Sequence, residues 1–370
     1  MKIGIVTLSQ SFSYGACLQA YATYKAIENM GFDVEFINYM NEYEQNQNHL
    51  ISKTKDFGVK KNVIRTVENI FLRRYANRIQ AFNDFHNNLP KTQPFTDSES
   101  LTDLHYDILV SGSDQLWNPD IFGGLDEVFF LNFGKAKKRI SYAASAGSHV
   151  FSDGEKERIT KLLEGYTAIS TRENELKIQV EEMTSTTVSQ VLDPTFLIAG
   201  NEWLQLVKDL KPVADERYIL VYMIGVPYRY YREHYAKIVR FYAEKLDAKV
   251  YAVSPDSFIP LYGCDKNLND ITPFELIQAI NNAELIITSS FHGVSFSVTL
   301  NKKFIALKNS NPLRVRNLLQ LCDLEDRVID SLEYEKCEKL LDDVDYQKAN
   351  EALTKMREFS YNWLKEKIIE

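Results

Sequence analysis

Short apolar runs alternate along the chain with longer segments in which apolar residues recur every three or four positions. The short runs are typical of buried parallel strands, and the recurring pattern is typical of helices. The chain begins with a strand at residues 2–8, a helix at 16–30 and a strand at 34–39. Gly31 follows the helix at the position where glycine commonly ends one. This β-α-β order favours a parallel sheet.

The same alternation continues to about residue 324. Further strands are predicted at 106–110, 140–144, 168–173 and 188–192, and, after a short helix and linker at 198–216, at 218–224, 249–254, 284–287 and 303–307. Two such series predict an α/β fold of two Rossmann-like domains that face a cleft. We place the N-terminal domain at residues 1–195, with a helical insertion at about 41–100, and the C-terminal domain at 196–345.

Residues 346–370 have the pattern of one amphipathic helix. Its apolar stripe consists of Ala352, Leu353, Met356, Phe359, Trp363, Leu364 and Ile368. We predict that this stripe packs back on the first domain.

The insertion has a helical pattern at about residues 62–85, in which Arg73, Arg74 and Arg78 flank large apolar side chains. Such a segment could be an interfacial surface that meets a lipid-linked substrate. It could equally be an ordinary amphipathic helix with a solvated face, which we favour.

Composition narrows the class of protein. The 370 residues carry a net charge of −8 without a dense basic block, which argues against a nucleic-acid partner. The four cysteines have neither a CxxC nor a zinc spacing and are expected as buried thiols in a reducing cytosol. The N-terminus is too short and too β-like for a signal peptide, and no apolar run would span a membrane. We expect a cytoplasmic protein, at most peripheral to the inner face of the cell membrane, and see no metal cluster.

The most concentrated candidate chemistry lies on the turn after the run at 284–287. His292 stands there beside Ser289, Ser290 and Gly293. Ligands of open α/β sheets bind at the carboxyl ends of the strands. Gly293 would let the backbone approach a ligand closely, and a helix start offers free N–H groups to an anion. The alternative is that His292 caps a helix and Gly293 merely turns the chain.

Two polar turns of the first domain could bind a sugar. The loop at 9–15 contains Tyr14 and Gly15 but lacks the GxGxxG pattern, and it would suit a sugar or a phosphate. In the turn at 111–119, Asp114 and Gln115 could hydrogen-bond a hydroxylated ligand, and Trp117 could stack on a sugar face. Alternatively, Asp114 caps a helix and Trp117 belongs to the core.

Arg172 stands at the carboxyl end of the strand predicted at 168–173. A guanidinium in this position can grip a carboxylate or a phosphate in fork geometry. The alternative is that it only pairs with Glu173 or Glu175.

Five segments occur in an order that resembles the polysaccharide pyruvyl transferase family. They are residues 13–22 (SYGACLQAYA), 110–119 (VSGSDQLWNP), 170–173 (STRE), 191–194 (VLDP) and 288–293 (TSSFHG). The resemblance spans about residues 1–324. It implies a fold similar to the two-domain GT-B glycosyltransferases. It also implies transfer of the enolpyruvyl group of phosphoenolpyruvate onto two hydroxyls of a hexose, which gives a cyclic pyruvate ketal and phosphate without a further cofactor.

The resemblance assigns roles to particular residues. His292 takes the place of the family's histidine, and Arg172 that of its arginine before the linker. The basic residue after the last strand falls on Arg314, with Lys308 and Arg316 as alternatives. Many members have arginine and leucine before the histidine, whereas this chain has Ser290 and Phe291, so one expected anion contact is missing.

The resulting hypothesis assigns His292 as the acid/base, because imidazole titrates near working pH. Arg172 and Arg314 would clamp the donor, with Ser289 and Ser290 as supporting hydrogen bonds. The acceptor would be a hexose such as galactose on a lipid-linked precursor of a capsule or exopolysaccharide. It would lie near Tyr14, Gly15, Asp114, Gln115 and Trp117. The rivals are a nucleotide-sugar-dependent glycosyltransferase of GT-B type and a non-catalytic carbohydrate-binding protein.

Overall fold

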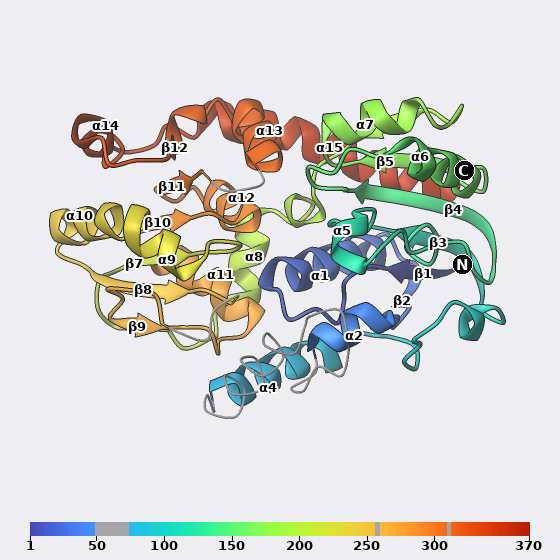
Figure 1. The fold of residues 1–370 in the computed structure, drawn as a ribbon, viewed down its shortest axis with the longest axis horizontal. Helices are drawn as coiled ribbons and strands as arrows, with labels where there is room; N and C mark the ends of the chain where they lie inside the picture. The colour runs from blue at the N-terminus through green and yellow to red at the C-terminus, as the bar shows by residue number, and fades with distance from the viewer. Residues whose placement is uncertain (49–73, 256–259, 309–311) are drawn as a thin grey trace.

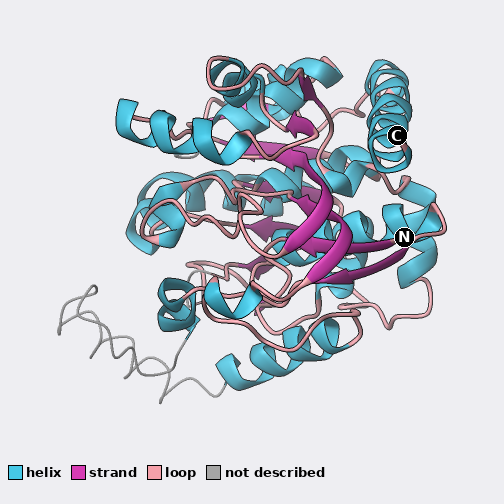
Figure 2. Cartoon of the chain, turned by 90° about the vertical axis from the view of Figure 1, so that its right-hand side faces the viewer, coloured by secondary structure: helices cyan, strands magenta, loops and turns pink. Residues whose placement is uncertain are grey.

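The structure is a computed structural model that describes residues 1–48, 74–255, 260–308 and 312–370. The chain forms two parallel sheets of six strands each (Figure 1). Helices lie on both sides of the strands (Figure 2). The predicted α/β class with two Rossmann-like domains is therefore confirmed.

The first sheet has the strand order β2-β1-β3-β4-β5-β6. Its strands are β1 (Lys2–Val6), β2 (Asp33–Phe36), β3 (His105–Ser111), β4 (Lys135–Ala144), β5 (Ala168–Thr171) and β6 (Val188–Gln190). Its helices are α1 (Tyr14–Asn29), α2 (Glu42–Asn48), α4 (Arg74–Asn87), α5 (Pro119–Phe122), α6 (Asp153–Leu163) and α7 (Asn174–Glu181). All neighbouring strands are parallel, so their carboxyl ends share one edge.

The second sheet has the order β12-β11-β10-β7-β8-β9. Its strands are β7 (Tyr218–Tyr222), β8 (Lys249–Val253), β9 (Lys266–Asn267), β10 (Leu285–Thr288), β11 (Phe304–Leu307) and β12 (Val328–Ile329). Its helices are α8 (Gly200–Val207), α9 (Tyr228–Tyr230), α10 (Ala236–Leu246), α11 (Pro273–Asn282), α12 (Phe291–Thr299), α13 (Pro312–Cys322) and α14 (Tyr334–Lys339). The domain limits placed at 195 and 345 stay predictions.

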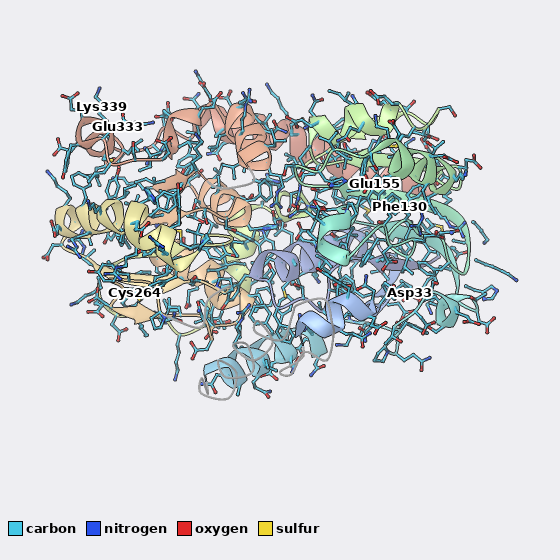
Figure 3. All side chains as sticks on the ribbon, in the orientation of Figure 1. Asp33, Phe130, Glu155, Cys264, Glu333 and Lys339 are labelled. Atoms are coloured by element: carbon cyan, nitrogen blue, oxygen red, sulfur yellow. The ribbon has the colours of Figure 1, made fainter. Side chains whose placement is uncertain are left out.

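Helix α1 joins the two domains. Tyr21 on this helix contacts Phe274 of α11 at 5.1 Å and Trp203 of α8 at 5.8 Å between ring centroids. Figure 1 shows α1 beside α8 and α11, between the two sheets. Phe130 and Cys264 mark the opposite halves of the molecule in Figure 3. The middle of α1 is thereby held against the second domain.

The insertion is also tied to both domains. Arg78 of α4 is buried, and its guanidinium donates to Phe12 O and to Pro255 O. Arg73 lies outside the described residues, and so does the side chain of Arg74. Arg78 therefore points inward and adds nothing to a membrane surface, which agrees with an ordinary amphipathic helix.

The C-terminal helix α15 (Gln347–Ile369) packs on the first domain, as predicted. Ser360 Oγ accepts a hydrogen bond from Leu192 N at 3.0 Å, and the ring of Trp363 lies 6.3 Å from that of Tyr142. Phe359, which we placed in the apolar stripe, is exposed. Among the described helices, none combines the length and apolar character that crossing a bilayer requires. None of the four cysteines forms a disulfide, and Cys264 is partly exposed rather than buried.

Candidate active site

His292 is the second residue of α12 and follows the carboxyl end of β10. Ser290, not His292, caps this helix, because its Oγ accepts from Gly293 N at 3.3 Å. Ser289 Oγ donates to Ile224 O and accepts from Ile224 N, both at 2.9 Å. The two serines thus shape the turn, and their role toward a ligand stays a prediction.

The imidazole of His292 lies against the first turn of α1 across the domain interface. A Cβ placed on Gly15 would be 2.0 Å from His292 Nδ1, which is far inside van der Waals contact. The residue is only 6% exposed. Glycine at position 15 is therefore what permits the ring to occupy this place.

Asp193 provides a carboxylate on the other side of the ring. Its Oδ1 accepts from Thr195 N at 3.0 Å and from Thr195 Oγ1 at 2.7 Å, which fixes the group. Its Oδ2 is 3.7 Å from His292 Nε2, an ion-pair distance that is too long for a hydrogen bond. Burial favours a higher pKa for Asp193, but His292 and Arg172 outweigh it and the pKa is lowered. Asp193 therefore stays ionised beside the imidazole.

Arg172 is surrounded by three carboxylates. Its Nε donates to Glu173 Oε1 at 2.8 Å and its Nη1 to Asp193 Oδ2 at 2.7 Å, and its Nη2 lies 3.5 Å from Asp114 Oδ1. Burial works to lower the pKa of Arg172, but Glu173, Asp193 and Asp114 raise it well above its ordinary value. Pairing with Glu173, the alternative that the sequence left open, is thus observed. Whether Arg172 also holds a donor stays a prediction.

Arg314 of α13 approaches the same carboxylate and shares an aromatic ring with Arg172. Its Nη1 is 3.5 Å from Asp114 Oδ1. The guanidinium carbons of Arg172 and Arg314 lie 4.9 and 5.6 Å from the centroid of Phe291, within cation–π range. Burial and then Arg172 lower the pKa of Arg314. Asp114 is held ionised, because Arg172, His292 and Arg314 lower its pKa against the effect of burial.

Three buried polar atoms of this cluster have no hydrogen-bond partner within the described part of the chain. They are Glu173 Oε2, His292 Nε2 and Arg314 Nε. Buried polar groups are nearly always paired in native proteins, so unpaired ones in a cleft indicate a place for a ligand. The cluster also has three carboxylates but only two guanidinium groups, so a protonated His292 would balance its charge.

A cavity of about 390 Å³ adjoins the cluster between the domains. Its lining includes Arg172, Asp193, Phe291 and Arg314, with Asn317 as a further polar group. The imidazole of His292 is not part of this lining, although it lies 3.7 Å from Asp193 Oδ2 and its ring centroid lies 5.2 Å from that of Phe291. Within the described residues, no three His, Cys, Asp or Glu side chains are grouped to hold a metal ion.

Two predicted donor contacts lie away from this cluster. The ammonium of Lys308 is 3.6 Å from Asp330 Oδ2, and both side chains are mostly exposed. Arg316 is exposed, although it is only two residues from Arg314 on α13. Of the three basic residues considered after the strand β11, Arg314 alone joins Arg172 and Asp114.

Most of the predicted acceptor residues have structural partners instead. The buried Tyr14 hydroxyl donates to Asn269 O and Ile271 O, both at 3.1 Å, and so links the domains. Gln115 accepts from Asn118 Nδ2 at 3.1 Å. Gly15 receives the ring of His292.

Trp117 as a sugar platform is contradicted by its burial. The residue is 0% exposed, its Nε1 donates to Phe129 O at 3.2 Å, and its ring stacks on Phe130 at 4.9 Å. Its core alternative is therefore the correct one. Asp114 caps no helix and lies in the charged cluster.

The sequence analysis assigned no role to Asp193 or Phe291, and it considered Glu173 only as a partner of Arg172. The run Asp193-Pro194-Thr195 was visible after a strand, and Asp193 indeed caps a 3-10 turn (Pro194–Phe196). The local sequence predicts only this cap. The fold is needed to show that the second carboxylate oxygen of Asp193 faces Arg172 and His292.

Comparisons with known proteins support this fold and identify the family. UDP-N-acetylglucosamine 2-epimerase from Rickettsia bellii is similar over 100% of this chain and 95% of its own, with a TM-score of 0.50 and 9% identity. The UDP-GlcNAc 2-epimerase from Methanocaldococcus jannaschii is similar over 94% of each chain, with a TM-score of 0.50 and 12% identity. At these identities the likeness concerns the fold alone, and it agrees with the predicted GT-B-like arrangement of two Rossmann-like domains.

A search of curated proteins found no match. The sequence matches the family model described as "Polysaccharide pyruvyl transferase" over residues 14–311, which is most of the chain. This range includes Gly15, Arg172, Asp193 and His292. The chain therefore belongs to the polysaccharide pyruvyl transferase family and is a transferase.

Proposed function

We propose that the protein transfers the enolpyruvyl group of phosphoenolpyruvate onto two hydroxyls of a hexose in a surface polysaccharide or its lipid-linked precursor. The product would be a cyclic pyruvate ketal, with release of phosphate. The observation that carries this proposal is the meeting of His292, Arg172 and Arg314 from two domains beside one cavity. A lipid-linked acceptor would bring the enzyme to the cytoplasmic face of the membrane.

The donor is a small trianion, and fixed cations are needed to hold it and to stabilise the departing phosphate. Arg314 is the better candidate for direct contact, because within the described residues its Nε has no hydrogen-bond partner and Asp114 is its one ion-pair partner. Arg172 is engaged by three carboxylates. It would contribute to the wall of the donor site and keep Asp114 and Asp193 in place.

Ketal formation requires two additions at the central carbon of the donor. His292, protonated, gives a proton to the methylene carbon, and the first sugar hydroxyl adds to the central carbon while its proton returns to the imidazole. The second hydroxyl then displaces phosphate, and its proton leaves with the phosphate. Proton transfer of this kind contributes about 10²–10⁴-fold in rate.

Asp193 would support His292 in this role. A fixed carboxylate next to an imidazole stabilises the charged form and orients the ring, as the aspartate does in catalytic triads. In the arrangement described above the ring lies between Gly15 and Asp193. Substrate access to it therefore requires the two domains to part or the side chain to turn.

The test is phosphate release from phosphoenolpyruvate in the presence of a panel of galactosides, with the mass of the sugar product determined in parallel. We expect phosphate and ketal in equal amounts, and thermal stabilisation by phosphoenolpyruvate. Stabilisation and turnover with a nucleotide sugar, without use of phosphoenolpyruvate, would replace the proposal by a glycosyltransferase. Binding of sugars without turnover of either donor would indicate a carbohydrate-binding protein.

A further inference from the structure

A second pocket, of about 630 Å³, opens at the carboxyl edge of the second sheet. It lies where β7, β11 and β12 end, and it is distinct from the cavity beside Arg172 and Arg314. Its lining includes Gly225, Tyr230, Tyr235, Lys308, Asp330 and Ser331. None of the roles assigned above accounts for a pocket of this size, which lies in the range of ligand sites.

The pocket combines an accessible aromatic ring with a pair of opposite charges. Tyr230 is 46% exposed, and its ring is supported by the rings of His234 at 4.3 Å and Tyr235 at 5.4 Å between centroids. Lys308 and Asp330 stand 3.6 Å apart with mostly exposed side chains. A pyranose offers an apolar face to such a ring and neighbouring hydroxyls to a donor and an acceptor side by side.

The charges argue against an anionic occupant. The ammonium of Lys308 is already paired with Asp330, and that carboxylate would repel a phosphate. A nucleotide or a second phosphoenolpyruvate is therefore a poor fit. A neutral polyhydroxylated ligand could bind both groups and leave the ion pair intact.

One wall of the pocket is the turn after β7, which is hydrogen-bonded to the turn before His292. Gly225 follows Ile224, whose N–H and C=O are both hydrogen-bonded by Ser289. A π-helical turn, Tyr231–Tyr235, forms the next part of the wall, and the Tyr235 hydroxyl donates to Lys308 O. Such π-helical turns are often found at functional sites. The pocket and the His292 turn therefore lie at the carboxyl ends of the neighbouring parallel strands β7 and β10.

We propose that this pocket is a glycan subsite that binds the sugar next to the pyruvylated hexose, with Tyr230 as the platform and Lys308 with Asp330 as hydroxyl contacts. The assignment as an acceptor subsite depends on the proposed function. This subsite places acceptor recognition in the second domain. The residues first considered for it in the first domain, Tyr14, Gln115 and Trp117, have structural partners instead.

The experiment measures sugar affinity by isothermal titration calorimetry without phosphoenolpyruvate. A panel of galactose-terminated disaccharides, lactose included, is compared with methyl galactoside on the full chain. We expect at least one disaccharide to bind about tenfold more tightly than the monosaccharide, which corresponds to about 1.4 kcal/mol. Tyr230→Ala and Asp330→Asn should each reduce this ratio to within about twofold of one.

Tyr334→Ala is the matched control, because Tyr334 is 64% exposed on α14 and does not line the pocket. It should leave the ratio unchanged. The proposal is overturned if no disaccharide gains over the monosaccharide, or if the pocket variants keep the full ratio. If the affinity ratio depends on the pocket but no phosphate is released from phosphoenolpyruvate, the sugar subsite is retained and pyruvyl transfer is rejected. If phosphate is released but the ratio does not depend on the pocket, pyruvyl transfer is retained and the subsite is rejected.

Discussion

Two buried histidines lie on either side of the first turn of α1, and their surroundings differ. His86 of α4 is 3% exposed, its Nε2 lies 3.3 Å from Cys17 Sγ, and three phenylalanine rings surround it. Burial, with Lys91, lowers its pKa to about 4, so it is neutral at pH 7. His292 is equally buried against Gly15, but Asp193 and Asp114 face it. His86 is thus a packing group among apolar rings, whereas His292 is buried beside ionised carboxylates.

The largest expected effect comes from removing the cation that balances those carboxylates. Arg172→Gln leaves Asp114, Glu173 and Asp193 without their main partner. Breaking a buried charge pair in this way costs about 3–5 kcal/mol in the free energy of unfolding, measured by urea denaturation. Lys245→Gln, which removes an exposed pair with Glu338, should cost less than about 1 kcal/mol. If both variants lost less than about 1 kcal/mol in the free energy of unfolding, the claim that Arg172 balances the buried carboxylates would be contradicted.

His86 should give the fold a pH dependence. Below about pH 6.5 an unfolded histidine binds a proton, but folded His86 does not until about pH 4. The unfolded state therefore holds more protons in this window, and the free energy of unfolding falls as pH falls, by up to about 1.4 kcal/mol per pH unit.

His86→Phe should remove this part of the pH dependence. The comparison is made by urea denaturation at pH 7 and pH 4.5 in both proteins. Lys91, Cys17 and Arg78 are the ionisable neighbours of this site and are unchanged by the substitution. Identical pH slopes for the two proteins would contradict a neutral, buried His86.

A substitution at Gly15 tests the contact between α1 and His292. Gly15→Ala would place a methyl group 2.0 Å from His292 Nδ1, so the ring or the whole helix must move. Misplacement of a catalytic group by about 1 Å can cost about 100-fold, and we expect transfer to fall about 10–100-fold. Gly154→Ala is the control, because its added methyl group would meet no atom within 4 Å. Equal activity of the two alanine variants would mean that the His292 position is not needed for transfer.

The smallest effect is expected at Trp117. Trp117→Phe keeps an aromatic ring but loses the hydrogen bond to Phe129 O and some volume, so the free energy of unfolding should fall by about 1–2 kcal/mol. The Michaelis constant for the acceptor should not change. A selective rise in that constant would restore Trp117 as a sugar contact.

The fold could be predicted from the sequence because it depends on local periodicity. The buried strands and the capped helices each carry their own signal, as Thr272 and Glu275 do with the capping box that begins α11. The expected strand at 284–287 and the helix after it were found as β10 and α12.

The site could be predicted only in part, because its contacts are tertiary. His292, Arg172 and Arg314 were identified, and the structure brings them together around Asp114 and Asp193. Trp117 and Tyr14 stand in polar turns, which is why the sequence suggested them as sugar contacts. Only the partners Phe129 O and Ile271 O, distant in the chain, show that these side chains are used in packing.

The two histidines also provide the most direct test of the account. His292→Gln and His86→Gln are compared by phosphate release from phosphoenolpyruvate with the best galactoside acceptor, below the melting temperatures of both variants. We predict that His292→Gln lowers the rate about 10²–10⁴-fold and that His86→Gln changes it by less than about threefold. A folded His292→Gln variant that transfers at the rate of His86→Gln would contradict the role of His292 as the proton carrier.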